Sequence, residues 1–155
     1  MENLLNETEF QIAEVDLIYK SKVKASERPG IKTSKDAWTI LQNNWDVNKI
    51  DFIEQFKVIL LNRANKVLGI LKASSGGVTG TLVDPKVVFV AALKANACGI
   101  IISHNHPSGN LKPSLKDQQI TAKLKNGAEL LDISLLDHLI ITSEGYLSFA
   151  DEGLL

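Results

Sequence analysis

The stretch that most restricts the fold is residues 99–117, which read GIIISHNHPSGNLKPSLKD. It begins with a short apolar run, residues 99–103, of the kind that forms a strand buried on both faces of a sheet. A turn-rich loop follows from His104 to Pro113, and Ser114 then stands where it can cap a helix that ends near Gly127. A buried strand leading through a loop into a helix is typical of domains that layer helices on a sheet.

The sequence on either side of this stretch alternates between strand and helix patterns. Apolar periodicity and turn residues predict strands at 56–61, 66–72, 133–142 and 146–149, and helices after Thr33 or Ser34 and from Asp84-Pro85 through Ala95. We therefore expect an α/β domain of the layered α+β kind, with a mixed β-sheet flanked by helices. A glycine-rich loop at 75–81 lacks the Gly-Lys-Ser/Thr ending of a phosphate-binding loop, so a nucleotide site there is not expected.

Composition limits the class of protein. At about 150 residues per domain, 155 residues make one globular domain. The 17 Lys+Arg against 18 Asp+Glu give a net charge of −1, which argues against a dedicated nucleic-acid binder but leaves room for a local basic patch. A single cysteine excludes an internal disulfide and a cysteine-rich zinc fold. With no run of 18 apolar residues and an acidic, polar start, we expect a cytoplasmic protein without a membrane span or secretory signal.

The first 32 residues differ from the rest. Residues 10–19 alternate with period 2 and predict a strand, which could pair with the edge of a neighbouring chain. The stretch 20–35 is basic and broken by Pro29-Gly30, and we interpret it as a solvated connector rather than a nucleic-acid patch. The chain thus divides into an N-terminal strand and connector, 1–32, and a domain, 33–155.

Three polar side chains around the loop at 104–113 have the spacing of a metal site. His104 and His106 are two residues apart, so in an extended chain both rings lie on one side. Asp117 lies in the first turn of the expected helix, from which it can point back to the strand end. Two histidines and one carboxylate leave the fourth tetrahedral position of Zn²⁺ open, as in catalytic zinc sites. Residues 114–117 also fit an ordinary capping box, and the two roles are compatible.

The whole pattern His104-x-His106-x7-Ser114-x2-Asp117 resembles the JAMM motif of the JAB/MPN metalloprotease superfamily. Residues 104–114 (HNHPSGNLKPS), 136–140 (LDHLI) and 146–153 (YLSFADEG) are similar to its RadC-like branch. The resemblance covers roughly residues 33–155 and implies a layered fold related to that of cytidine deaminases. RadC-like proteins often carry a helical segment ahead of this domain, whereas residues 1–32 have the pattern of a strand and a connector.

The resemblance also implies an activity. One Zn²⁺ held by His104, His106 and Asp117 would activate a water, and Ser114 would help to stabilise the oxyanion. The superfamily places a glutamate on an early strand as general base and acid, and by position this is Glu54. From the residues alone, Glu54 is not separable from Glu129 or Glu144. The expected function is a zinc-dependent hydrolase that cleaves a peptide or isopeptide bond of a protein or peptide substrate.

Two other functions stay open. RadC-like proteins have been described as DNA-repair proteins, so a module acting on or near DNA is the main alternative, although the charge balance does not support it. A non-catalytic scaffold is the third, and the complete ligand set disfavours it. The sequence does not identify the bond that is cleaved, because the loops at 74–83 and 107–113 carry no readable specificity. We interpret His138, next to Asp137 on an expected strand, as a structural core residue rather than a partner of the metal ligands.

Overall fold

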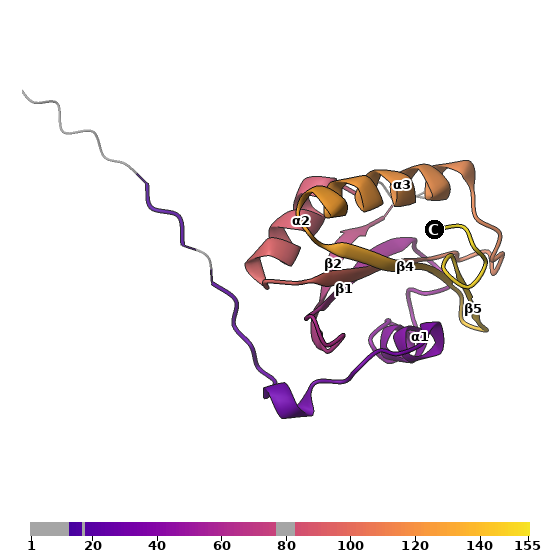
Figure 1. Cartoon of the computed structure of the whole chain (residues 1–155). Coiled ribbons are helices and arrows are strands. Elements are labelled where there is room, and N and C mark those ends of the chain that lie inside the picture. Colours follow the sequence, from indigo (N-terminus) through magenta and orange to yellow (C-terminus); the bar gives the residue numbers. More distant parts are fainter. Residues whose placement is uncertain (1–12, 17, 77–82) are drawn as a thin grey trace, which may run out of the picture.

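The computed structural model describes residues 13–16, 18–76 and 83–155. Its helices and strands are, in chain order, the 3-10 helix η1 (Ala25–Glu27), α1 (Ser34–Asn43), β1 (Gln55–Leu61), β2 (Val67–Ser75), α2 (Pro85–Lys94), β3 (Gly99–Asn105), α3 (Leu115–Leu130), β4 (Ser134–Ile141) and β5 (Tyr146–Ser148). Helices α2 and α3 lie on one side of the sheet and α1 lies on the other (Figure 1). The fold is therefore the expected α+β arrangement of a mixed sheet between helical layers.

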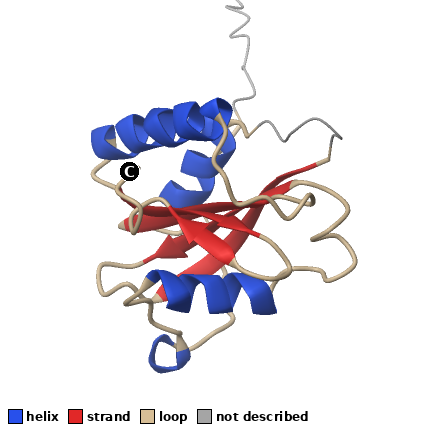
Figure 2. Ribbon diagram, turned by 90° about the vertical axis from the view of Figure 1, so that its right-hand side faces the viewer, coloured by secondary structure: helices blue, strands red, loops and turns tan. Residues whose placement is uncertain are grey.

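The five strands form one sheet in the order β2-β1-β3-β4-β5. All neighbouring strands are antiparallel except β3 and β4, which are parallel and joined by helix α3. Figure 2 shows the strands in red between the helical layers. Strand β3 is thus the middle strand, and the chain leaves its carboxyl end directly toward α3.

Alternation along the strands builds two cores. In β3, Ile100 and Ile102 pack into a cluster on the side of α2 and α3, whereas Ile101 packs into a second cluster on the side of α1. The same alternation in β1 sends Val58 to the first cluster and Ile59 to the second. Because successive strand side chains point to opposite faces, the next position in the Ile100–Ile102 series, His104, faces α3.

Two boundaries differ from those that the sequence predicts. Strand β3 does not end at Ser103 but continues through His104 to Asn105, because β1 pairs with it as far as His104 and β4 as far as Asn105. Helix α3 does not end near Gly127 but continues to Leu130. A Cβ at Gly127 would lie 2.8 Å from Cε2 of Phe89, so this glycine permits close packing of α2 on α3 rather than ending the helix.

The strand predicted over residues 10–19 is not present at the described positions 13–16 and 18–19, while 10–12 and 17 lie outside the described residues. The side chains of Val15 and Ile18 are 85% and 58% exposed, so the alternating pattern has no sheet face to cover there. The Tyr19 hydroxyl donates to the Leu68 carbonyl at the start of β2.

Within the described ranges, no helix is both long enough and apolar enough to span a bilayer.

Candidate metal centre

The carboxyl end of the middle strand, β3, carries the two histidines of the candidate site and lies beneath α3. His104 is 2% exposed and pairs with Phe56 of β1 and Ile140 of β4. His106 follows the end of the strand, and its backbone N–H donates to the Ile141 carbonyl at 3.0 Å. The backbones that carry both rings are therefore held on the sheet rather than in a free loop.

The first turn of α3 delivers the carboxylate. Ser114 is the N-cap of this helix, and its hydroxyl oxygen accepts from the Asp117 backbone N–H at 3.1 Å. In return, the Ser114 backbone N–H donates to Oδ2 of Asp117 at 2.8 Å. This capping box fixes the side chain of Asp117 at the helix N-terminus, turned toward the end of β3.

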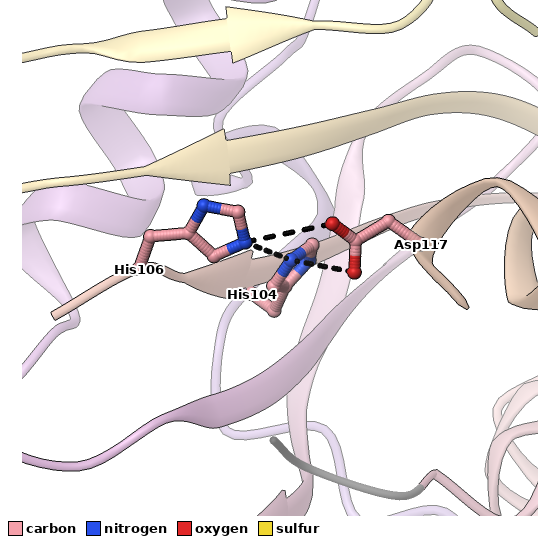
Figure 3. A group of neighbouring side chains, drawn as sticks. All are labelled: His104, His106 and Asp117. Carbon is pink, nitrogen blue, oxygen red and sulfur yellow. Dashed lines mark hydrogen bonds and ion pairs between the residues drawn. The ribbon is translucent and has the colours of Figure 1, made fainter. Parts of the chain in front are cut away.

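The three side chains converge, as Figure 3 shows. Nε2 of His104 lies 2.9 Å from Nε2 of His106 and 3.2 Å from Oδ1 of Asp117, and Nε2 of His106 lies 3.5 Å from Oδ2 of Asp117. One ligand atom from each of these residues falls within 4.8 Å of the other two. The structure thus brings together the three residues that the sequence predicts as ligands, in a group that could hold a metal ion.

The electrostatics of the group favour a cation. Burial raises the pKa of the Asp117 carboxyl, but the adjacent rings of His104 and His106 outweigh burial and hold the pKa well below its usual range. Asp117 raises the pKa of His106 against the effect of burial, because its carboxylate accepts a hydrogen bond from the protonated ring, and the negative charge of Glu54 adds to the rise. The carboxylate is therefore charged, and the site attracts positive charge, whether from a proton or from a metal ion.

The ring orientation of His106 fits metal binding. Its Nδ1 lies 2.5 Å from the carbonyl oxygen of Asn110. A carbonyl oxygen only accepts hydrogen bonds, so Nδ1 carries the hydrogen and Nε2 of the neutral ring presents a lone pair. That lone pair faces His104 and Asp117, as it does in zinc sites whose histidines donate through the second nitrogen to a carbonyl. The donor set fits Zn²⁺ with an open fourth position.

The resemblance implies that Glu54 lies on an early strand. In the structure it lies immediately before β1, one residue outside the strand. It lines a cavity of about 650 Å³ together with Phe52, His106, Asn110 and other residues of the 50s and 106–112. The base that the resemblance implies and one expected ligand therefore share one cavity. The other two acidic residues that the sequence leaves open, Glu129 and Glu144, are exposed and do not line this cavity.

Asn105, the residue between the two histidines, holds the segment that carries Glu54. Its side-chain oxygen accepts from the Gln55 backbone N–H at 2.7 Å, and its amide nitrogen donates to the carbonyls of Ile50 and Ile53 at 2.7 and 2.8 Å. The side chain of Asn105 is fully buried, so the bonds to Gln55 and Ile50 are shielded from water and the bond to Ile53 is partly so. Glu54 is thus fixed relative to the histidines by the residue that separates them, a link that no pattern in the sequence indicates.

His138 contacts the site directly, which corrects the expectation that it is only a structural core residue. Its Nε2 lies 2.8 Å from Nδ1 of His104, and its Nδ1 lies 2.6 Å from the hydroxyl oxygen of Thr121. The ring is completely buried, and burial holds its pKa well below the usual range of histidine. Sequence spacing does not find this contact, because His138 comes from β4 and Thr121 from the second turn of α3.

Comparison with known proteins agrees with this geometry. The family model of the RadC-like JAB domain matches residues 31–154. A UPF0758 protein of Flavobacterium johnsoniae is 48% identical over 124 residues, which are 80% of this chain and 53% of that protein. UPF0758 proteins of Symbiobacterium thermophilum and Thermotoga maritima are 45% and 44% identical over 66% and 64% of this chain, and 44% and 45% of their own lengths. The chain spans about half the length of these curated relatives.

Proposed function

Since the chain belongs to the RadC-like JAB domain family, we propose that it is a JAMM-type zinc-dependent hydrolase that cleaves a peptide or isopeptide bond. The observation that carries the proposal is the convergence of two histidine Nε2 atoms and a capped aspartate, together with a cavity that His106 shares with Glu54. JAMM domains are a metalloprotease superfamily, and each residue type of their motif has its counterpart at this site. The substrate would be a protein or peptide.

His104, His106 and Asp117 would hold one Zn²⁺. When bound, this ion polarises a carbonyl oxygen and lowers the pKa of water from 15.7 to about 7. The two rings approach through Nε2, and the capping box keeps the carboxylate of Asp117 in place before any metal arrives. The protein's contribution is thus a preorganised set of three ligands on a middle strand and a helix N-terminus.

Glu54 acts as general base and then as general acid. Its carboxylate takes the proton of the attacking water and returns it to the leaving amine nitrogen. Such a group typically contributes 10²–10⁴-fold to the rate, provided that it lies within hydrogen-bond reach. The cavity that Glu54 shares with His106, and the Asn105 bonds on either side of it, support this role.

Ser114 stabilises the oxyanion. Its hydroxyl oxygen accepts from the Asp117 backbone N–H, which occupies a lone pair and leaves the hydroxyl hydrogen available. Ser114 is exposed at the N-terminus of α3, where the helix dipole also favours a developing negative charge. The cap and the catalytic donor are therefore two uses of one side chain.

Metal analysis of purified variants, combined with an assay on peptide and isopeptide substrates, tests these roles. We expect one zinc per chain in the wild type and in Glu54→Gln, and none in His106→Ala. Glu54→Gln should lose at least about 100-fold in kcat, since it retains shape but not the acid–base group. Glu129→Gln, at an exposed position of α3, is the matched control and should retain both zinc and activity. A wild type without zinc, or a Glu54→Gln variant that loses zinc, would contradict the assignment.

A further inference from the structure

A chain of three hydrogen bonds connects two of the expected ligands through side chains outside the JAMM pattern. The Thr121 hydroxyl donates to the backbone carbonyl of Asp117 at 2.6 Å, and the same oxygen lies 2.6 Å from Nδ1 of His138. His138 in turn contacts Nδ1 of His104 through Nε2, at 2.8 Å. The chain therefore begins at the backbone of Asp117 on α3, crosses β4 and ends on the ring of His104 in β3.

The direction of every hydrogen in this chain follows from its first bond. Because Thr121 gives its only hydrogen to the Asp117 carbonyl, its oxygen must accept from Nδ1–H of His138. In a neutral imidazole the other nitrogen is then an acceptor, so Nε2 of His138 accepts from Nδ1–H of His104. The remaining nitrogen of His104, Nε2, is left with a lone pair, and it faces His106 and Asp117.

An irregularity in the backbone of β4 orients His138 toward this series of hydrogen bonds. Its pairing with β3 shifts register, from Ile100 opposite Leu135 to Ile101 opposite Asp137, so the strand contains one extra residue. Leu135 packs on the side of α2 and α3 while Leu139 packs on the side of α1, although regular alternation would put them on one face. The irregularity therefore turns His138, rather than Asp137, toward α3, as β-bulges often re-aim a side chain near a site.

We propose that Thr121 and His138 are positioning residues that fix the nitrogen through which His104 binds the metal and couple this ligand to the helix that carries Asp117. The inference rests on the proposed function in one respect, namely that His104 is a metal ligand. Histidine ligands usually donate their second nitrogen to a carboxylate, a carbonyl or water, and loss of such a partner costs 10–100-fold in metal affinity. Here a second histidine, itself oriented by a threonine, takes that place.

If His138 only filled space in the core, substitutions of its hydrogen-bond partners would have different effects. The ring of His138 lies 4.5 Å from the ring of Phe149 and 6.0 Å from that of Phe56, measured between centroids, so apolar neighbours enclose it. If enclosure were its only role, the tautomer would not matter and Thr121 would be replaceable by valine at no cost to metal binding. Zinc affinity and the tautomer of His138 therefore distinguish the two roles without a substrate.

The experiment measures zinc affinity by chelator competition for Thr121→Val, Thr121→Ser and His138→Leu. We expect a loss of about 10-fold in Thr121→Val and 10–100-fold in His138→Leu, with wild-type affinity in Thr121→Ser, which retains the hydroxyl. Ser148→Ala is the matched control, since it also removes a buried hydroxyl, one on β5 that donates to Asp137 of β4 rather than to the His104 chain. It should bind zinc as tightly as the wild type.

Imidazole ¹⁵N spectra of the zinc-loaded wild type provide a readout that needs no variant. We expect His138 to carry its hydrogen on Nδ1 and His104 to carry its hydrogen on Nδ1. Protonation of His138 at Nε2, or wild-type zinc affinity in Thr121→Val, would overturn the proposal. A wild type that binds no zinc would instead overturn the proposed function, so the two failures are distinguishable.

Discussion

The N-termini of α1 and α3 carry the same local motif but lie in different surroundings. Thr33 and Asp36 form one capping box, and Ser114 and Asp117 form the other. The N-cap N–H donates to the aspartate Oδ2 at 2.9 Å in α1 and at 2.8 Å in α3. The two boxes are therefore nearly identical in their internal geometry.

The two aspartates differ in the residues that face them from outside their own helix. Asp36 is partly exposed, and within the described part of the chain its hydrogen-bond partners include no histidine; backbone N–H groups of Lys32 and Thr33 lower the pKa of its carboxyl. Asp117 faces the end of β3, where both of its oxygens lie near histidine rings. A capping motif thus becomes part of a site only when the tertiary structure places a strand end with suitable side chains opposite it.

The largest difference is expected in metal binding. We predict that Asp117→Asn abolishes stoichiometric zinc binding, because the site then lacks the charged oxygen that offsets the cation. Asp36→Asn should leave zinc binding unchanged. Both asparagines can still accept from the N-cap N–H, but Asp117→Asn also removes the charge that the histidine rings stabilise, so it should lower the free energy of unfolding more than Asp36→Asn does. Zinc content and thermal unfolding check this, and equal zinc loss in both variants would show that the comparison is mistaken.

The next difference is expected between the two N-caps. Ser114→Ala and Thr33→Ala should each lower the free energy of unfolding by about 1 kcal/mol, the usual cost of a lost cap. Only Ser114→Ala should also lower kcat, by about 10²–10³-fold, because only this hydroxyl is proposed to contact an oxyanion. Urea unfolding and turnover of a peptide or isopeptide substrate measure the two effects. A fall in kcat no larger than that of Thr33→Ala would remove Ser114 from the catalytic set.

The smallest expected difference is in the response of the zinc-free protein to pH between 5 and 8. His106 has its pKa raised above 6.5, chiefly by Asp117, so its contribution to stability is fully present below pH 6.5 and is lost as pH rises through the raised pKa. Backbone amide signals of Ser114 and Asp117 should therefore shift with a midpoint above 6.5, while those of Thr33 and Asp36 stay constant. Zinc binding requires the unprotonated ring, so zinc affinity should rise with pH over the same window. Midpoints below 6.5 would contradict this sign.

Local patterns in the sequence predicted most of the elements. The strand now bounded as Gln55–Leu61 and the helix Pro85–Lys94 are confirmed to within a residue, because alternation, caps and a proline at the first helical position are local properties. The prediction failed where distant chain segments decide. Gly127 was predicted to end a helix, but it lies inside α3 and allows Phe89 to pack closely. The alternating residues 13–16 were predicted to form part of a strand, but they pair with no sheet.

The candidate site divides in the same way. Spacing along residues 104–117 was enough to predict which three side chains meet, since a strand, a tight loop and a capped helix turn constrain one another over a short distance. The same reasoning misjudged His138, because its contact depends on an extra residue in β4 and on a threonine 17 positions earlier in the chain. It also had no means of finding the role of Asn105, whose partners lie about 50 residues away.

The sequence by itself therefore determined which three side chains meet at the candidate site, the helix cap that holds Asp117, and the layered fold, all of which follow from local periodicity and spacing. Only the tertiary structure decided which capping aspartate faces histidines, which acidic residue shares a cavity with His106, and which nitrogen of His104 faces the candidate site. The reason is physical: hydrogen-bond direction in a buried network depends on every partner at once, and those partners come from β1, β3, β4 and α3.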